Sequence, residues 1–201
     1  IEDEENGSMR VKNKYKTPEI KEALYQLLVA PPKGFIDSGE GLPRIYLLRI
    51  MGDIQETRAI PYLIECGDNG VAMSLGRMGE AGLKALSPEL KKNKINRTTV
   101  VALTEMVKKG NVGYISDEKS RQDIKEYLKK AVYNSDEIGK KYAVRGLGEY
   151  AIQGDTEAIV LLNKLATTDP TLGKAKNWPI RMEATKMLEK LNNSGGHNQQ
   201  P

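Results

Sequence analysis

Apolar residues recur along the chain at the spacing of one helix face. Ile20, Leu24, Leu27 and Leu28 fall at i, i+4, i+7 and i+8, so they form one stripe on a helix. Similar helical spacing recurs in residues 83–90, 124–132, 158–165 and 180–191. No segment alternates between apolar and polar residues for long enough to indicate a strand. The pattern therefore predicts an all-α chain of about nine or ten helices.

Residues that start and stop helices agree with this pattern. Residues 17–19 (Thr-Pro-Glu) combine an N-cap, a proline suited to the first helical position and an acid in the first turn. Residues 135–137 (Ser-Asp-Glu) predict another start, because acids favour the positive end of a helix. Residues 108–110 (Lys-Lys-Gly) predict a stop, and residues 178–180 (Trp-Pro-Ile) are expected to open the last helix.

A glycine followed by an acid recurs between helical segments, at Gly52-Asp53, Gly79-Glu80 and Gly154-Asp155. A leucine lies eleven residues after each glycine, and apolar residues lie four and seven residues before it. We interpret each unit as a helix, a glycine turn and a second, antiparallel helix capped by the acid. Because one such pair cannot bury its own apolar face, we expect stacked pairs that form an elongated solenoid.

The repeated residues resemble those of a known family. Residues 75–80 (Leu-Gly-Arg-Met-Gly-Glu), 59–63 (Ala-Ile-Pro-Tyr-Leu), 144–148 and 180–188 are similar to HEAT repeats, of the short variety seen in phycobilisome-lyase-type proteins. The resemblance covers roughly residues 43–191. It implies a right-handed α-solenoid, an armadillo-like α-α superhelix, of about four to five antiparallel helix pairs.

The two ends of the chain differ in composition from its middle. Residues 1–16 are polar and residues 192–201 are of low complexity, so both are expected to be disordered. Residues 17–42 hold an N-terminal helix and a Pro/Gly-rich linker, and residues 43–191 hold the HEAT-like solenoid. The sequence leaves open whether the N-terminal helix packs on the array as a cap.

Composition limits the chemistry that the chain can perform. Apolar residues make up 39% and charged residues 29%, which is typical of a soluble globular chain. With one Cys and one His, a disulfide framework and multi-Cys or multi-His metal sites are excluded, and a His-based triad would need His197 in the tail. No apolar run is long enough to predict a membrane span. Cys66 fits either a reducing or an oxidising compartment, so localisation stays open between the cytoplasm and export.

Three motifs have a structural explanation beside a functional one. The glycines in residues 76–82 match G-x-x-G-x-x-G, but no strand precedes them and no Lys-Ser/Thr follows, so we interpret them as a helix–helix turn rather than a phosphate loop. The glycines in residues 146–148 are interpreted as a point of close helix packing. The basic run in residues 91–97 suits either a phosphate-tracking stripe or cations that oppose helix dipoles, and we favour the second explanation.

The leading hypothesis is a non-enzymatic scaffold for protein–protein interaction. The net formal charge is +4, and four of the acids stand at residues 2–5, so the rest of the chain is more basic. The second helix of each HEAT pair usually lines the concave face, so the resemblance implies that Tyr62, Lys84 and Lys125 face solvent there and contact a partner. A net positive face suits an acidic peptide or protein. Trp178 is either a surface anchor for a partner or a staple packing on the next helical turn.

Two other functions are alternatives. The basic body, and the precedent of HEAT-like proteins that hold DNA on a basic face, favour nucleic-acid binding, although few aromatic residues lie among the basic ones. Some HEAT-like proteins attach bilin chromophores, which makes a chromophore-lyase-like enzyme accessory the third hypothesis. HEAT-like iron hydroxylases use several His-Glu pairs, which the single His excludes. No catalytic residue, cofactor or metal site is predicted.

Overall fold

The computed structural model describes residues 2–3, 9–10, 16–32, 42–92, 94–171 and 178–195. These residues form an all-α protein of ten α-helices, which confirms the predicted class and number of helices. Two short strands within residues 1–16, β1 (Glu2–Asp3) and β2 (Met9–Arg10), pair antiparallel and were not predicted. The helices and the single 3-10 turn of the described residues are α1 (Pro18–Val29), α2 (Leu42–Asp53), η2 (Thr57–Ala59), α3 (Ile60–Cys66), α4 (Asn69–Gly76), α5 (Glu80–Leu90), α6 (Arg97–Met106), α7 (Glu118–Asn134), α8 (Glu137–Ile152), α9 (Thr156–Thr168) and α10 (Pro179–Gly195).

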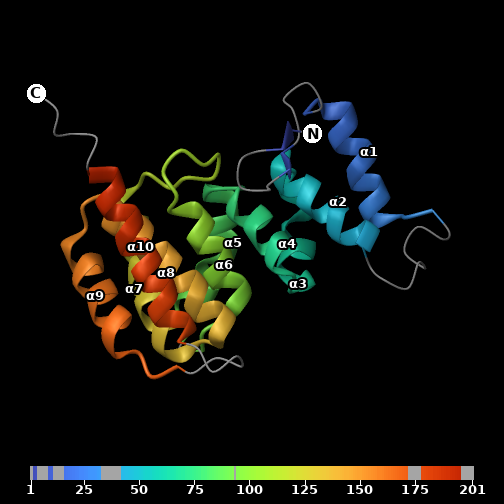
Figure 1. Ribbon diagram of the computed structural model, residues 1–201. Helices are drawn as coiled ribbons and strands as arrows, with labels where there is room; N and C mark the ends of the chain where they lie inside the picture. Colours follow the sequence, from blue (N-terminus) through green and yellow to red (C-terminus); the bar gives the residue numbers. More distant parts are fainter. Residues whose placement is uncertain are drawn as a thin grey trace, which may run out of the picture.

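Alternate helices form a row. Each of α2, α4, α6, α8 and α10 packs on the next member, and we call these five helices the row. The helices between them in sequence, α3, α5, α7 and α9, pack beside the row, and α1 packs on α2. The N-terminal helix therefore does lie against the array, at the opposite end from α10 (Figure 1).

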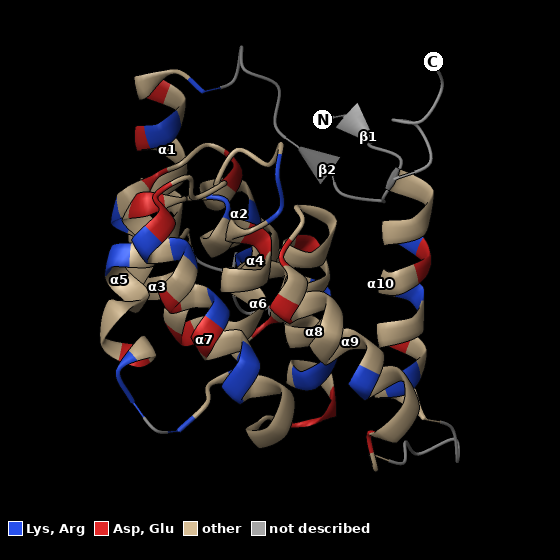
Figure 2. Cartoon of the chain, turned by 90° about the vertical axis from the view of Figure 1, so that its left-hand side faces the viewer, with Lys and Arg blue, Asp and Glu red and all other residues tan. Residues whose placement is uncertain are grey.

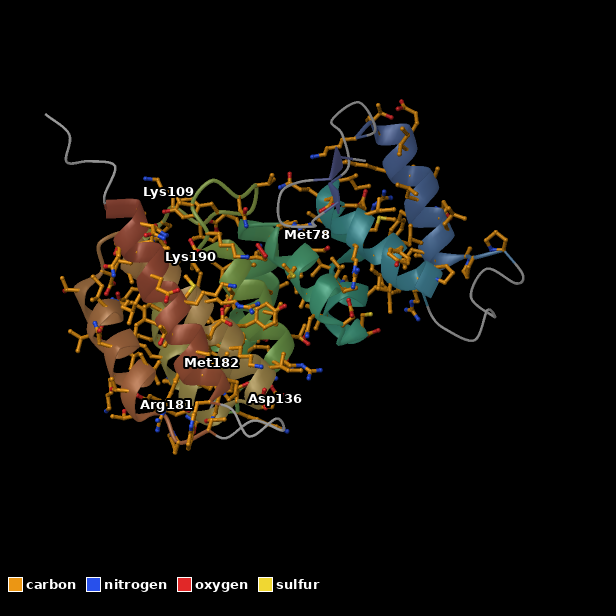
Figure 3. All side chains as sticks on the ribbon, viewed as in Figure 1. Met78, Lys109, Asp136, Arg181, Met182 and Lys190 are labelled. Carbon is orange, nitrogen blue, oxygen red and sulfur yellow. The ribbon has the colours of Figure 1, made fainter. Side chains whose placement is uncertain are left out.

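The later helices of the row run in the same direction. Arg97, the first residue of α6, pairs with Asp136, the N-cap of α8, at 3.3 Å. Asp136 lies at the same end of the molecule as Arg181 in the first turn of α10, whereas Lys109 and Lys190 lie at the other end (Figure 3). The chain returns between these helices through α7 and α9, as the predicted antiparallel pairs require.

The core follows the row from one end to the other. Leu48, Leu75, Leu103, Leu147 and Ala184, one from each helix of the row, have no exposed surface. The predicted apolar stripes of residues 124–132 and 158–165 supply further members from α7 and α9. The core is a continuous series of contacts between neighbouring helices. Burying one leucine side chain contributes about 1.5–3 kcal/mol, so each of these contacts stabilises the fold.

Glycines lie where successive helices of the row cross. The crossings place Gly52 against Ser74, Gly76 against Ala102, Gly146 against Thr104 and Gly148 against Met187. A Cβ on Gly76 would lie 2.4 Å from the carbonyl oxygen of Ala102, which is closer than two such atoms can come. The glycines of residues 76–82 and 146–148 are therefore packing and turn residues, as predicted.

Two of the three predicted glycine–acid turns are confirmed. Gly79 and Gly154 have φ values of 58° and 92°, the left-handed region in which glycine has no Cβ penalty. Asp155 then caps α9 by accepting the backbone N–H of Ala158 at 2.9 Å. Asp136 likewise caps α8, and Pro179 opens α10. Glu80 lies in the first turn of α5, where it meets the positive helix end without a side-chain cap bond.

The turn predicted at Gly52-Asp53 is wrong. Both residues belong to α2, which continues to Asp53 because Gly52 is needed at the crossing with α4. The left-handed position of this connection is Gln55, with φ of 55°, and its side-chain amide donates to the carbonyl of Arg77 at 3.3 Å. Asp53 forms an ion pair with Arg77, the residue that follows α4, instead of capping the next helix.

The predicted disordered ends are described only in part. Most of residues 1–16 and the linker residues 33–41 lie outside the described residues. At the other end α10 continues to Gly195, four residues into the segment assigned to the tail. His197 lies outside the described residues.

The crossing of α4 and α6 gives a stability prediction. Gly76→Ala should lower the free energy of unfolding by about 3 kcal/mol, because the new methyl group meets a backbone carbonyl that cannot move aside. Gly154→Ala is the matched control, because no atom lies within 4 Å of its Cβ position and only the left-handed φ, about 1 kcal/mol, opposes it. Urea unfolding of both variants measures the difference. Equal losses would mean that the crossing tolerates a methyl group.

Candidate functional site

A groove lies between α5 and α7. Its volume is about 510 Å³. The walls come from these two helices and from Lys91 at the end of α5. The lining residues are Glu80, Leu83, Lys84, Ser87, Leu90, Lys91, Ser120, Asp123, Glu126, Tyr127 and Lys130.

The two helices that form the groove run in the same direction. Gly79, just before α5, lies close to Gly113 in the loop that leads into α7. Beyond the other end of α5, the backbone N–H of Asn96 donates to the hydroxyl of Tyr127 on α7 at 3.0 Å. Helix α5 packs on α4 and α6, and α7 packs mainly on α8, whereas α5 and α7 make few direct contacts with each other. The groove is the space that this arrangement leaves between them.

The floor of the groove is formed by three apolar or aromatic side chains within a lining that is otherwise polar. Leu83 and Tyr127 are buried and Leu90 is half-buried. Burial raises the pKa of the Tyr127 hydroxyl, although the hydrogen bond from Asn96 opposes the shift. Tyr127 is therefore neutral and fixed, so the floor offers a rigid surface to apolar side chains.

Charged residues divide the groove into two ends. Glu80 and Asp123 lie toward the starts of α5 and α7, and we call them the acidic end. Lys91 and Lys130 lie toward the ends of the two helices, and we call them the basic end, with Lys84 between the two. None of these five residues forms an ion pair with another described residue, whereas Glu126, the third acid that lines the groove, pairs with Lys129 at 3.1 Å. The charges of the five residues are therefore available to a ligand.

Many other cations are neutralised within the protein. Basic and acidic positions are interspersed over the helices rather than gathered on one of them (Figure 2). Arg49 pairs with Asp68, Arg145 with Glu183, and Lys129 with Glu157. The lysines of the groove have no such partner among the described residues. Other exposed lysines also lack one, so what distinguishes the groove is that three such lysines line a single hollow.

The structure separates the four predicted contact residues. Lys84 lines the groove, as its prediction as a contact residue requires. Tyr62, on α3, is half-buried and packs against the core. Trp178, immediately before α10, is 40% exposed, and the guanidinium of Arg181 lies 4.2 Å from its ring centroid. Because α6 and α8 lie between α3 and α10 (Figure 1), Tyr62 and Trp178 do not form one site.

The prediction that Lys125 faces solvent is wrong. Its residue is only 8% exposed, and its ammonium group contacts Asp155 at 2.8 Å and Glu157 at 3.2 Å. Lys125 follows Ile124 of the predicted apolar stripe, and the start of α9 lies against that side of α7, which the sequence alone does not show. The lysine therefore joins α7 to the start of α9 and is not a partner contact.

The sequence did not single out Asp123 and Tyr127. Both belong to a stripe on α7 at i, i+3, i+7 and i+10, formed by Ser120, Asp123, Tyr127 and Lys130. This spacing was available as a signal, because it marks one face of a helix. The helix that faces this stripe could not be found in the same way, because α5 ends more than thirty residues before Asp123 in the chain.

A second polar cluster holds a buried cation. Arg121 is 9% exposed and lies between the rings of Tyr114 and Tyr150, with centroid distances of 5.2 and 4.9 Å. Its guanidinium donates to the Tyr114 hydroxyl at 2.8 Å and to the Gln153 side-chain carbonyl at 2.9 Å. Gln153 also donates to the carbonyl of Val107 at 3.1 Å. These bonds fix the loop between α6 and α7 onto α8, so the cluster supports the fold.

Comparisons of the chain with protein-family models, with curated proteins and with solved structures each find no match. The HEAT resemblance therefore depends on the repeated residues alone. Among the described residues, no cluster of His, Cys, Asp or Glu could hold a metal ion, and no helix is long and apolar enough to cross a membrane. Cys66, at the end of α3, is half-buried and a free thiol.

The Lys125–Asp155 contact gives a pH-dependent prediction. Burial raises the pKa of Asp155, but the hydrogen bonds from Lys125 and from the Ala158 N–H lower it by more than burial raises it. The pKa of Asp155 therefore lies below its usual range. A lowered folded-state pKa stabilises the protein in full above about pH 4, the pKa of an unfolded Asp, and this stabilisation is lost progressively as the pH falls from there toward the lower folded-state pKa. Lys125→Met should therefore cost about 1–2 kcal/mol at pH 7, and the difference from wild type should shrink below about pH 4.

Urea unfolding between pH 7 and pH 3 measures this difference. Lys164→Met is the control, because Lys164 is exposed on α9 and has no ion pair among the described residues. It should leave the free energy of unfolding unchanged at every pH. A Lys125→Met difference that stayed constant with pH would show that Asp155 does not depend on the lysine.

Proposed function

We propose that the chain is a HEAT-like, right-handed α-solenoid that acts as a non-enzymatic binding module. The contacts between successive helices of the row, and the recurring left-handed glycines before α5 and α9, support the solenoid. In such folds each unit contacts only its neighbours, and the side helices form an extended surface. The groove is part of the surface formed by the side helices α3, α5, α7 and α9.

The groove between α5 and α7 is the proposed binding site. The observation that supports it is the combination of an apolar floor, Leu83, Leu90 and Tyr127, with three lysines that have no ion pair within the described part of the chain, Lys84, Lys91 and Lys130. An apolar surface removed from water contributes affinity, and rim charges select the partner and speed association. The proposed ligand is a peptide segment of a protein partner, with acidic residues beside apolar ones.

The same groove supports nucleic-acid binding less well. Phosphate tracking requires cations along a whole surface. Glu80 and Asp123 stand at one end of the groove, where they would repel a phosphate backbone. The charges of the groove therefore favour a peptide over nucleic acid, and the experiment below distinguishes the two ligands.

The experiment selects peptides with the wild-type protein and then removes the lysines. A displayed library of random peptides of about twelve residues should yield sequences richer in Asp, Glu and Leu than the input. Lys84→Glu with Lys130→Glu should weaken the selected peptides about tenfold or more, because two attractions become repulsions. Fluorescence anisotropy with labelled peptides measures the change.

The matched control is Lys164→Glu with Lys186→Glu. Both lysines are exposed on α9 and α10, and neither has an ion pair among the described residues, so the net charge changes equally without altering the groove. The control should bind the selected peptides as wild type does. An equal loss in both double variants, or a library that yields no binder, would contradict the proposal. Tight, salt-dependent binding of duplex DNA by wild type, lost in the groove variant, would favour nucleic acid instead.

A further inference from the structure

The groove has a direction as well as a charge. Its acidic end lies toward the starts of two parallel helices, with Glu80 as the first residue of α5 and Asp123 in the second turn of α7, and its basic end, Lys91 and Lys130, lies toward their ends. From Glu80 to Lys91 the wall rises about 16 Å, at about 1.5 Å per residue. That length matches three turns of another helix. A ligand of this length would meet opposite charges at its two ends.

The walls favour a helical ligand over an extended one. An extended peptide gains affinity when its backbone pairs with the free edge of a sheet. Here the walls are α5 and α7, whose backbone groups bond within each helix. A helix satisfies its own backbone and presents one apolar stripe. Leu83 and Leu90 are seven residues apart on α5, so the floor repeats at the spacing of such a stripe.

We propose that the groove binds an amphipathic helix with acids in its first turn and lysine or arginine in its last turn, antiparallel to α5 and α7. This inference rests on the proposed function. In the antiparallel orientation the acidic first turn meets Lys91 and Lys130, and the basic last turn meets Glu80 and Asp123. The positive start of the ligand helix also lies beside the negative ends of α5 and α7.

The antiparallel orientation agrees with the ligand's own stability. Acids at the start of a helix and cations at its end stabilise that helix before it binds. A peptide with the reverse order of charges would match the groove only in the parallel orientation. It would then form a weaker helix, and its dipole would lie parallel to those of both walls. The groove therefore prefers one order of charge along the sequence.

Cross-linking measures the orientation directly. In a Cys66→Ser background, Ser87→Cys places a thiol toward the basic end of the groove, and Ser120→Cys places one toward the acidic end. The probe is a synthetic peptide of about fourteen residues with glutamates in its first turn, a leucine stripe, and lysines in its last turn. One version carries an activated cysteine at its N-terminus, and the other carries it at its C-terminus.

The N-terminal version should form its disulfide with Ser87→Cys about tenfold faster than with Ser120→Cys, and the C-terminal version should show the opposite preference. The rates are compared with those of a peptide of the same composition whose glutamates and lysines are exchanged, which should react more slowly at both positions. Circular dichroism should show that the peptide gains helix on binding.

The outcomes separate this inference from the proposed function. If neither the library nor the probe binds, the proposed function fails and so does the inference. Binding with no positional preference, with the opposite preference, or without a gain of helix overturns the helical, antiparallel ligand and leaves the peptide-binding groove intact. Equal rates for the charge-exchanged peptide would show that the two charged ends do not select the ligand.

Discussion

Close approach of neighbouring helices is the constraint on which the structure depends. A helix of the row has apolar residues on two flanks and buries them only if both neighbours lie near it. At each of the four crossings one partner supplies a glycine, as with Gly52 against Ser74 and Gly148 against Met187. A larger residue at these positions would push the helices apart and expose leucines along the whole row. The leucine core therefore depends on residues that bury almost no apolar surface themselves.

Ion pairs and polar contacts join the same neighbours and fix how they are aligned. Arg97 with Asp136 and Arg145 with Glu183 each connect consecutive helices of the row, while Lys125 connects α7 to the cap of α9. Surface pairs of this kind contribute little stability individually. They do specify which turn of one helix meets which turn of the next, a choice that apolar side chains leave nearly free. The cations used in this way are lost to partner binding, which is why the basic excess of the sequence does not give a uniformly basic face.

The sequence predicts the helices well because their evidence is local. Apolar spacing marks the buried faces of α7 and α9, and Asp136 and Asp155 cap the helices that their sequence positions indicated. The prediction from sequence is wrong where one residue pattern is compatible with two structural roles. Gly52-Asp53 has the glycine–acid pattern of the other predicted turns, yet its glycine lies at a helix crossing and its acid pairs with Arg77. The prediction that Lys125 faces solvent is wrong for a related reason. Helical spacing shows which side of α7 a residue occupies but not which helix covers that side.

The groove could not be predicted from local sequence patterns, because its two walls are distant in sequence and come together only through the row. Lys84 could be named from the sequence, while Asp123 and Tyr127 acquire a role only once α5 lies opposite α7. These two helices make few direct contacts, so their separation is set by the helices that they pack on, which are α4 and α6 for α5 and mainly α8 for α7. The groove therefore depends on two crossings of the row, that of α4 with α6 at Gly76 and that of α6 with α8 at Gly146. The close approaches that bury the leucine core thus also fix the distance between the two walls of the binding surface.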